Sequence, residues 1–506
     1  MSEQATFGAE LRRRRQEAGL SLTTLAERTH YSKGYLSKVE TGIATPNPAL
    51  AALCESELGA VGVLTALLPR SSPCRASRST LRPYELPAAA AVFAGRTAEV
   101  RAVRNALEVA GGVCVISGMG GIGKTELAVR CAHRLAPGFV DGCLFLDLRG
   151  CGVDVPIAGS TVMHSRILRA LDVPLERIPD DPDDRAAVYR SCLRGRSLLL
   201  VLDNVVSAEQ VRPLLPAESK CRVLITSRSR LTSLDDARHV FLDGLNEPEA
   251  AELFVSLVRM SPGEIVARVV HHCAGLPLAI RIAAARLRAH PAWDIRELDR
   301  RLDAEVSRLS ELDDGERSLQ ATFQLSMRQL SSEDVSLFGL LALHPGKDFD
   351  VYSASALLAR PFREVDRLLD RLHDVYLLTQ PSAGRYSFHD LLRLFAAESV
   401  LAAMTDRQRR IAFRRLIDFA VRSAAQADRL LFPHRFRCEI EFGESVPEIV
   451  RLDDADAAFA WFRCEWRGLV ELCRVARERG EHERCWQLAY LLCRFFFMQN
   501  CGIRGS

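Results

Sequence analysis

Gly118-Met119-Gly120-Gly121-Ile122-Gly123-Lys124-Thr125 is the stretch of sequence that decides the fold. The apolar run Val113–Ser117 before it predicts a buried strand, and the amphipathic run Glu126–Leu135 after it predicts a helix. Glycines at such a junction let successive backbone N–H groups turn toward an anion, and the helix N-terminus adds its partial positive charge. In a phosphate-binding loop of this kind, Lys124 reaches the β- and γ-phosphates and Thr125 binds Mg²⁺. A flexible glycine-rich turn is the alternative, and the flanking strand and helix argue against it.

The composition is that of an ordinary soluble protein. The chain has 506 residues, 48% hydrophobic and 26% charged, which suggests roughly three to five domains. No apolar run reaches the length of a membrane span, and Met1–Gln4 lacks the basic-then-apolar form of a signal peptide. The 15 cysteines include no Cys-x-x-Cys pair, which favours reduced thiols over disulfides or zinc. We therefore expect a cytoplasmic protein with no membrane partner.

Three short helices are predicted near the N-terminus, at residues 7–18, 21–29 and 32–41. Ser21 and Ser32 are the expected N-caps of the second and third helices. The short turn between these two helices is typical of a helix-turn-helix unit.

Residues 20–42 resemble the phage-repressor (Cro/C1, or XRE) family of DNA-binding domains. The resemblance implies that the third helix enters the major groove of double-stranded DNA. It places Lys33, Gly34 and Lys38 at base-reading positions, with Ser32, Tyr35 and Ser37 beside them. Two residues depart from the family, because Leu22 stands where a phosphate-contacting Gln is common and His30 where Gly is usual. The alternative is a helical domain that binds protein.

Strands and helices alternate after a proline-rich, basic linker at residues 69–91. Phe93–Arg96 opens the new domain, and apolar runs at 143–148, 197–202 and 222–226 lie between helical patterns. Such alternation predicts a parallel sheet that is covered by helices on both faces.

Four polar or special positions follow the phosphate-binding loop. Asp203 ends an apolar strand, as a Walker B carboxylate that helps to position Mg²⁺ does. Arg228 ends another strand, where its guanidinium could report on a γ-phosphate, although an ordinary surface arginine is the alternative. Pro277 restarts a helix, and His389 precedes a last helix, a position that alone favours a structural role.

In order, these motifs resemble the NB-ARC module of bacterial STAND-class NTPases over roughly residues 92–400, and with the XRE-type domain they resemble actinobacterial transcriptional regulators. The resemblance implies binding of ATP or ADP with Mg²⁺, with Lys124 and Asp203 as catalytic residues and Thr125 and Asp203 as metal ligands. The nucleotide-binding residues that it implies are Phe93, Gly95, Arg96, Gly118, Gly120, Gly121, Ile122, Gly123, Lys124, Thr125, Glu126, Arg228, Pro277 and His389.

The resemblance also implies a role for several of these positions. The segment at Phe93 and Pro277 flanks the adenine, Arg228 senses the γ-phosphate, and His389 contacts the β-phosphate of ADP. Asn204 departs from the pattern, because many relatives carry there a second Asp that assists the attacking water. An amide cannot act as a general base, so we expect at most a slow ATPase that serves as a switch.

The expected fold class is multidomain, with α and α/β parts. The expected domains are a helix-turn-helix domain at 1–68, a linker at 69–91, a P-loop nucleotide-binding domain at 92–245, a helical domain at 246–315, a winged helix at 316–404 and a helical segment at 405–506 that resembles a truncated tetratricopeptide-like region. Within the winged helix we expect strands at 375–379 and 385–388. The helix pair 455–479 and 481–499 is expected to leave an apolar end at Phe495–Phe497.

These expectations together indicate a transcriptional regulator that is switched by its nucleotide. ADP would hold a closed monomer through His389, and ATP would free the winged helix, promote homo-oligomerisation and change binding to double-stranded DNA. A signalling or defence scaffold whose N-terminal domain recruits protein is the second hypothesis. A fast ATPase motor is the third, and Asn204 argues against it.

Overall fold

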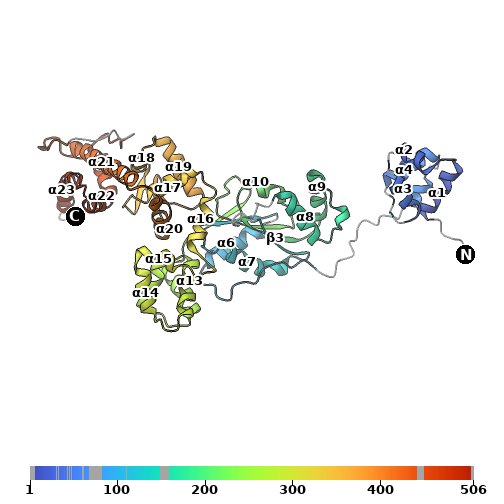
Figure 1. Cartoon of the computed structure of the whole chain (residues 1–506), viewed down its shortest axis with the longest axis horizontal. Coiled ribbons are helices and arrows are strands. Elements are labelled where there is room, and N and C mark those ends of the chain that lie inside the picture. Colours follow the sequence, from blue (N-terminus) through green and yellow to red (C-terminus); the bar gives the residue numbers. More distant parts are fainter. Residues whose placement is uncertain are drawn as a thin grey trace. The chain divides into compact units, whose positions relative to one another are not determined.

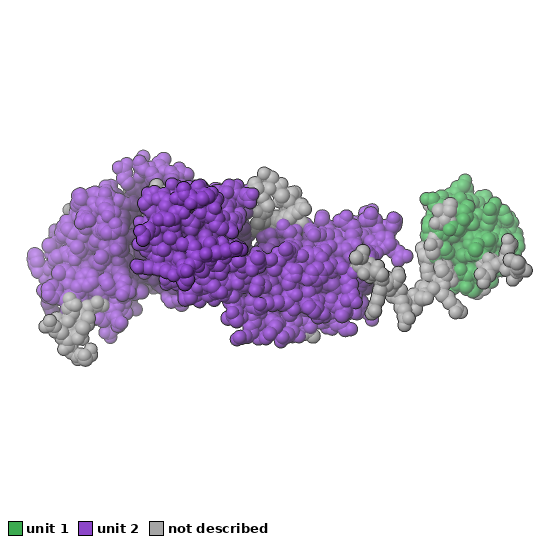
Figure 2. All heavy atoms as spheres, turned by 90° about the horizontal axis from the view of Figure 1, so that it is seen from below, with its two compact units in different colours: residues 1–81 green, residues 82–506 purple. Residues whose placement is uncertain are grey.

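The computed structural model describes residues 6–29, 31, 33–42, 44, 46, 48–59, 62–67, 82–109, 111–148, 159–440 and 449–502. The chain divides into two compact units, residues 1–81 and residues 82–506, which Figure 2 shows in different colours. Within the described residues, no helix is both long enough and apolar enough to span a membrane.

The first unit is a small helical domain (Figure 1). Its helices are α1 (Phe7–Glu17), α2 (Leu22–Thr29), α3 (Lys33–Glu40), α4 (Pro48–Leu58) and α5 (Val63–Ala66). Ser21 caps α2 as expected, because its Oγ accepts a hydrogen bond from the Thr24 N–H at 3.0 Å. The centre of the core consists of fully buried leucines from four helices: Leu11, Leu25, Leu36 and Leu50.

Close contact between α1 and α3 fixes the position of α3 in this unit. Gly8 has no room for a side chain, since a Cβ there would lie 2.3 Å from the carbonyl oxygen of Val39. Arg15 donates to Glu40 at 2.6 Å in a largely buried ion pair between the same two helices. One face of α3 therefore packs rigidly on the core, and the opposite face stays exposed.

The second unit is built on a five-stranded parallel sheet in the order β2-β3-β4-β1-β5. The strands are β1 (Val113–Gly118), β2 (Gly142–Asp147), β3 (Leu198–Val205), β4 (Arg222–Ser227) and β5 (Arg238–Leu242). The expected parallel sheet is confirmed, and β5 is an additional strand. Along β3, Leu199 and Val201 pack into one core while Leu200 and Leu202 pack into another, so the sheet is buried on both faces.

Helices cover the two faces of this sheet. The helices α6 (Thr97–Glu108) and α7 (Lys124–Leu135) contribute to one core, and α8 (Ser160–Ala170), α9 (Pro182–Leu193) and α10 (Ala208–Val211) to the other. The phosphate-binding loop connects β1 directly to α7, which is the strand-loop-helix order that the sequence predicts.

Part of the expected linker lies on the sheet. The N–H of Cys143 donates to the Pro83 carbonyl at 2.9 Å, and the N–H of Glu85 donates to the Cys143 carbonyl at 3.0 Å. Gly142 makes this approach possible, because its φ is +117° and a Cβ there would lie 2.4 Å from the Pro83 oxygen. Residues 83–85 thus cover the edge of β2 and belong to the second unit.

A run of helices follows the sheet. These are α11 (Glu247–Val258), α12 (Glu264–His272), α13 (Pro277–Ala289), α14 (Ile295–Asp303), α15 (Glu305–Glu311), α16 (Leu319–Met327), α17 (Ser332–Leu341), α18 (Val351–Leu358), α19 (Phe362–Asp374) and α20 (Asp390–Phe395). Asn246 forms a capping box with Glu249 at the start of α11, and Pro277 occupies the first turn of α13, where its missing N–H costs nothing.

A three-stranded antiparallel sheet, in the order β6-β8-β7, lies among the later helices. Its strands are β6 (Asp348–Asp350), β7 (Thr379–Ser382) and β8 (Arg385–Ser387). The strand expected at 375–379 is wrong, because β7 begins only at Thr379 and the preceding residues form a turn. The turn is buried, which explains its apolar residues Tyr376, Leu377 and Leu378 without any pairing in a sheet. Tyr376 has a φ of +57°, which is typical of a turn.

Three longer helices end the described chain: α21 (Asp406–Leu431), α22 (Ala455–Glu478) and α23 (His482–Gly502). Gly480, at φ +77°, lies between the last two, as the sequence predicts. The expected apolar end is only partly present. Phe495 is fully buried, with its ring centroid 5.1 Å from that of Phe462, whereas Phe497 is 65% exposed. Because α21 packs on both α22 and α23, more of this aromatic run is buried than the repeat argument allows.

Candidate functional site

The backbone of the phosphate-binding loop needs glycine for two reasons. Gly121 and Gly123 have φ values of +80° and +93°, which residues with a side chain rarely adopt. Gly120 is enclosed instead, because a Cβ there would lie 2.8 Å from the Thr322 methyl group and 2.9 Å from the Arg228 Nη1. The loop is therefore in contact with α16.

Lys124 is buried at the start of α7 and spans the loop. Its Nζ donates to the carbonyls of Gly118 and Met119, at 2.9 Å each. These bonds hold the ammonium group inside the loop, where the phosphates of a bound nucleotide would meet it.

The carboxylate of Asp203 lies at the carboxyl end of β3 and is buried. Its Oδ1 accepts hydrogen bonds from the hydroxyls of Thr125, at 2.8 Å, and Thr226. Burial raises the pKa of Asp203, and the bonds from Thr226 and Thr125 act against this rise. The expected juxtaposition of Thr125 and Asp203 is present, and both supply oxygen donors of the kind that Mg²⁺ prefers.

Asn204 holds two carboxylates together. Its Nδ2 donates to Asp147 Oδ1 at 3.0 Å and to Asp203 Oδ2 at 3.1 Å. An aspartate at this position would add a third negative charge, whereas the amide donates to both neighbours. Asp147 was not among the expected site residues. It ends the apolar strand β2, just as Asp203 follows the apolar part of β3, and the two aspartates are register partners in the sheet.

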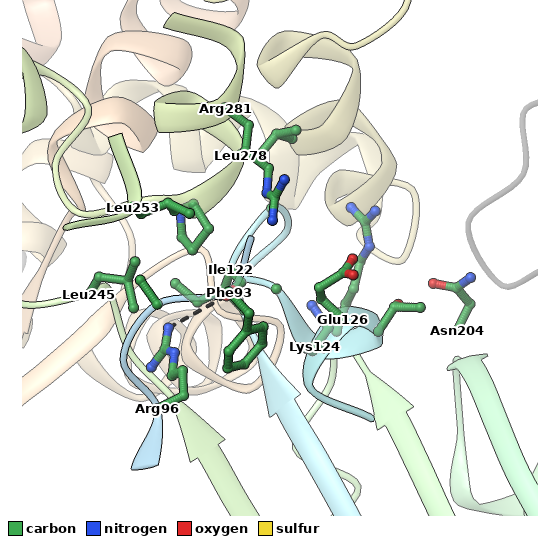
Figure 3. Close-up of a pocket in the computed structure, with 16 residues that line it drawn as sticks. Phe93, Arg96, Ile122, Lys124, Glu126, Asn204, Leu245, Leu253, Leu278 and Arg281 are labelled. Atoms are coloured by element: carbon green, nitrogen blue, oxygen red, sulfur yellow. Dashed lines mark hydrogen bonds between the residues drawn. The ribbon is translucent and has the colours of Figure 1, made fainter. Parts of the chain in front are cut away.

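A pocket of about 260 Å³ opens beside the loop (Figure 3). The expected residues that line it are Phe93, Arg96, Gly121, Ile122, Gly123, Lys124, Thr125, Glu126, Arg228 and Pro277. Lining residues that sequence reasoning did not assign to nucleotide binding are Ala94, Asn204, Leu245, Leu253, Leu278 and Arg281. The expected residues Gly95, Gly118, Gly120, Asp203 and His389 are not part of the lining.

The pocket lining combines apolar and charged side chains. Phe93, Leu253 and Pro277 are among the apolar ones, and the guanidinium of Arg130 lies 4.7 Å from the centroid of the Phe93 ring. Figure 3 shows Lys124 and Glu126 on the first turn of α7. A flat apolar group beside a polar anion would suit such a cavity.

Arg96 is engaged by its own domain. It is buried, pairs with Glu99 at 2.9 Å and donates to the Asp243 carbonyl. Gly95 precedes it at φ +64°, and a Cβ there would lie 2.4 Å from the Glu249 carboxyl group. These contacts fix the segment that carries Phe93.

Arg228 is hydrogen-bonded to α16. Its Nη1 donates to the Thr322 carbonyl at 2.6 Å and to the Ser326 hydroxyl at 3.2 Å. Close by, the hydroxyls of Ser117 and Tyr376 share a buried hydrogen bond of 2.8 Å. Residues 316–404 therefore contact the ends of β1 and β4 directly.

His389 is bonded to the backbone rather than exposed to the pocket. Its Nε2 donates to the Ala274 carbonyl at 3.1 Å, and among the described residues its buried Nδ1 has no hydrogen-bond partner. Burial lowers the pKa of His389, so the imidazole is neutral at pH 7. The expected contact with a β-phosphate stays a prediction.

The exposed face of α3 carries the expected DNA-binding residues. Lys33, Gly34 and Lys38 are exposed, and Tyr35 and Ser37 are half-buried. Among the described residues outside its own helical turn, no atom lies within 4 Å of a Cβ built on Gly34, so this part of the face is open. Ser32 and His30 lie outside the described residues.

Tyr31 stacks on Tyr35, with ring centroids 5.6 Å apart. Leu22 packs against the core of the unit. An apolar residue at the position where relatives often place Gln is thus explained by burial.

Comparison with known families finds a matching domain model in each of the two units. Residues 6–68 match the helix-turn-helix domain model, and residues 96–262 match the NB-ARC domain model. The chain is 40% identical to the regulatory protein AfsR of Streptomyces coelicolor over 399 residues, which are 75% of this chain and 40% of the relative. It is 37% identical to AfsR of Streptomyces griseus over 455 residues, 88% of this chain and 46% of the relative.

The chain thus spans less than half the length of these relatives. A solved structure of a STAND protein with a tetratricopeptide repeat sensor from Pyrococcus horikoshii matches 80% of this chain and 59% of that chain, at 18% identity and a TM-score of 0.32. The resemblance that the motifs indicate is confirmed: this is an NB-ARC protein with an N-terminal helix-turn-helix domain, similar over most of its length to the AfsR regulatory proteins of Streptomyces.

Proposed function

We propose that the chain is a DNA-binding transcriptional regulator whose nucleotide state sets the position of its winged-helix domain, residues 316–404. One observation carries the proposal. Arg228, which lines the pocket at the end of β4, donates to the Thr322 carbonyl of α16. A side chain placed to meet a phosphate is thus engaged by the first helix of that domain.

The pocket supports an adenine nucleotide as ligand. Phe93 and Pro277 offer apolar surfaces for a flat base, and Lys124 offers a buried cation for the phosphates. The NB-ARC match makes ATP and ADP the nucleotides that we assign.

Mg²⁺ fits the donors beside Lys124. The Thr125 hydroxyl and the Asp203 carboxylate lie 2.8 Å apart and are hard oxygen ligands. When bound there, Mg²⁺ would neutralise charge on the β- and γ-phosphates.

Competition for Arg228 is the proposed switch. Both hydrogens of its Nη1 are engaged by α16, one by the Thr322 carbonyl and one by the Ser326 hydroxyl, so turning Nη1 toward a γ-phosphate oxygen would break bonds to that helix. A charge-assisted hydrogen bond is worth about 1.5–3 kcal/mol, and reversing a switch from 1:99 to 99:1 needs about 5.5 kcal/mol. About two to four such contacts therefore suffice, and we expect a closed monomer with ADP and a homo-oligomer with ATP.

Slow hydrolysis suits this role. The amide of Asn204 donates its hydrogens to Asp147 and Asp203 and cannot accept a proton from water. A long-lived ATP state would give the opened winged helix time to assemble with other copies.

The exposed face of α3 supports DNA as the partner of the first unit. Lys33 and Lys38 lie on this face, where phosphates and base edges attract positive charge. The matched relatives are named regulatory proteins, and others are named HTH-type transcriptional regulators. A lone helix-turn-helix unit binds weakly, and two units at about 34 Å spacing bind specifically, so assembly would raise DNA affinity.

The test measures DNA affinity in each nucleotide state, on duplexes selected by the wild-type chain from a random pool. We expect tighter binding with a non-hydrolysable ATP analogue than with ADP, and loss of this difference in Arg228→Ala. Changing Lys33 and Lys38 to Glu should abolish binding, while Lys220→Glu, an exposed lysine of the second unit, serves as the control. Equal DNA affinity in the ADP, ATP and apo states would refute the switch, and no DNA binding by wild type would favour a protein-recruiting scaffold.

A further inference from the structure

Arg281 is a cation of the nucleotide pocket that none of the sequence motifs includes. It lies on α13 four residues after Pro277, about one helical turn further along, and both residues line the pocket. Figure 3 shows its guanidinium reaching from α13 toward the loop that carries Ile122 and Lys124.

Arg281 keeps most of its hydrogen-bonding capacity. Within the described part of the chain, its guanidinium makes one hydrogen bond, from Nη2 to the Val92 carbonyl at 2.6 Å, and no ion pair. The other pocket arginines make more such bonds, because Arg96 pairs with Glu99 and donates to the Asp243 carbonyl, and Arg228 donates to both Thr322 and Ser326. A guanidinium has five N–H donors, so four of those of Arg281 remain for a ligand.

The start of α13 lies directly on the phosphate-binding loop. The N–H of Leu278 donates to the Gly121 carbonyl at 3.1 Å. Pro277 Cγ lies 3.9 Å from the position of a Cβ on Gly123. Residues four apart share one helix face, so the long side chain of Arg281 projects from the face that meets the loop.

We propose that Arg281 binds a phosphate group of the bound nucleotide. This inference rests on the proposed nucleotide function and names the group that the helical domain, residues 246–315, contributes to it. The ligand class is a nucleoside di- or triphosphate, which then links the phosphate-binding loop to α13. While α16 holds Arg228, Arg281 is the cation that makes this link.

Titration calorimetry of the nucleotide-free full chain with ADP and with adenosine tests the proposal. Arg281→Gln should weaken ADP at least about tenfold, the loss of one charge-assisted hydrogen bond, and leave adenosine within about twofold of wild type. Arg288→Gln is the matched control, because Arg288 is exposed on the same helix and does not line the pocket. Unchanged ADP affinity in Arg281→Gln, or an equal loss for adenosine, would overturn the inference.

A second measurement needs no variant to fold. Phenylglyoxal modifies accessible arginines, and mass spectrometry locates the product. In the wild-type chain we expect ADP to protect Arg281 but not Arg288, and adenosine to protect neither; modification of Arg281 that ADP does not slow overturns the inference. Wild type that binds no ADP at all would instead refute the proposed function itself.

Discussion

Tyr376→Phe removes one oxygen atom and should loosen the closed arrangement. The lost hydroxyl shares a hydrogen bond of 2.8 Å with Ser117, and both side chains are buried. Leaving the Ser117 hydroxyl without this partner costs roughly 1–3 kcal/mol in the closed arrangement. In an open arrangement water satisfies the same group, so the loss falls on the closed state alone. Within this range, a loss of about 1.4 kcal/mol lowers the closed-to-open ratio tenfold.

The release rate of a fluorescent ADP analogue measures this shift, because ADP leaves more easily when the winged helix has opened. We expect release to be at least about fivefold faster in Tyr376→Phe. Tyr352→Phe is the control, since Tyr352 is half-buried in the same domain and packs on Phe362. A double-mutant cycle with Ser117→Ala should give a coupling energy of about 1 kcal/mol. Additive effects, or unchanged release in Tyr376→Phe, would refute the reasoning.

Three further predictions concern charge. Asn204→Asp adds a third carboxylate beside Asp147 and Asp203. Calorimetry without metal should therefore show a loss of roughly 1–3 kcal/mol in the free energy of unfolding, and this loss should be smaller when Mg²⁺ and ATP are present. A variant as stable as wild type without metal would contradict this. Asp203→Asn should remove most of the Mg²⁺ dependence of ATP affinity, and titrations with Mg²⁺ or EDTA that match wild type would count against the metal site. Burial lowers the pKa of His344 to about 3, so the unfolded chain binds its proton first and stability falls as the pH drops from about 6.5 toward 3. His344→Asn keeps an acceptor for the Gly346 N–H. In urea titrations the free energy of unfolding of this variant should fall less steeply with pH, by up to about 1.4 kcal/mol per pH unit, and a fall as steep as in wild type would contradict the role of His344.

The central strands could be predicted because each of them is a single run of apolar residues, which indicates burial. β3 is apolar along most of its length, as a strand buried on both faces must be. β5 carries no such signal, because only Val240 and Leu242 of its five residues are buried and its partner β1 lies far away in sequence. Tertiary pairing determines such a strand. The turn at 375–378 is the converse case, because its run of buried apolar residues has the same sequence pattern as a buried strand.

The candidate site divides in the same way. Lys124 and Asp203 belong to local patterns and could be assigned from them. Arg281 reaches the pocket through helix packing, which no short pattern records, and Asp147 meets Asp203 through the order of the strands. Sequence reasoning could have found Asp147 from the carboxylate that follows an apolar strand. The partner of His389 is a backbone carbonyl, and such a partner has no signature in the sequence.

Gly120 restricts the chain in a way that phosphate chemistry alone does not require. A methyl group at this position would act as a wedge between the loop and α16, since it would lie 2.8 Å from the Thr322 methyl group. Under the proposed switch, this contact would disfavour the closed form more than it disfavours nucleotide binding. Alanine variants at this position are therefore expected, under the same proposal, to regulate without their signal.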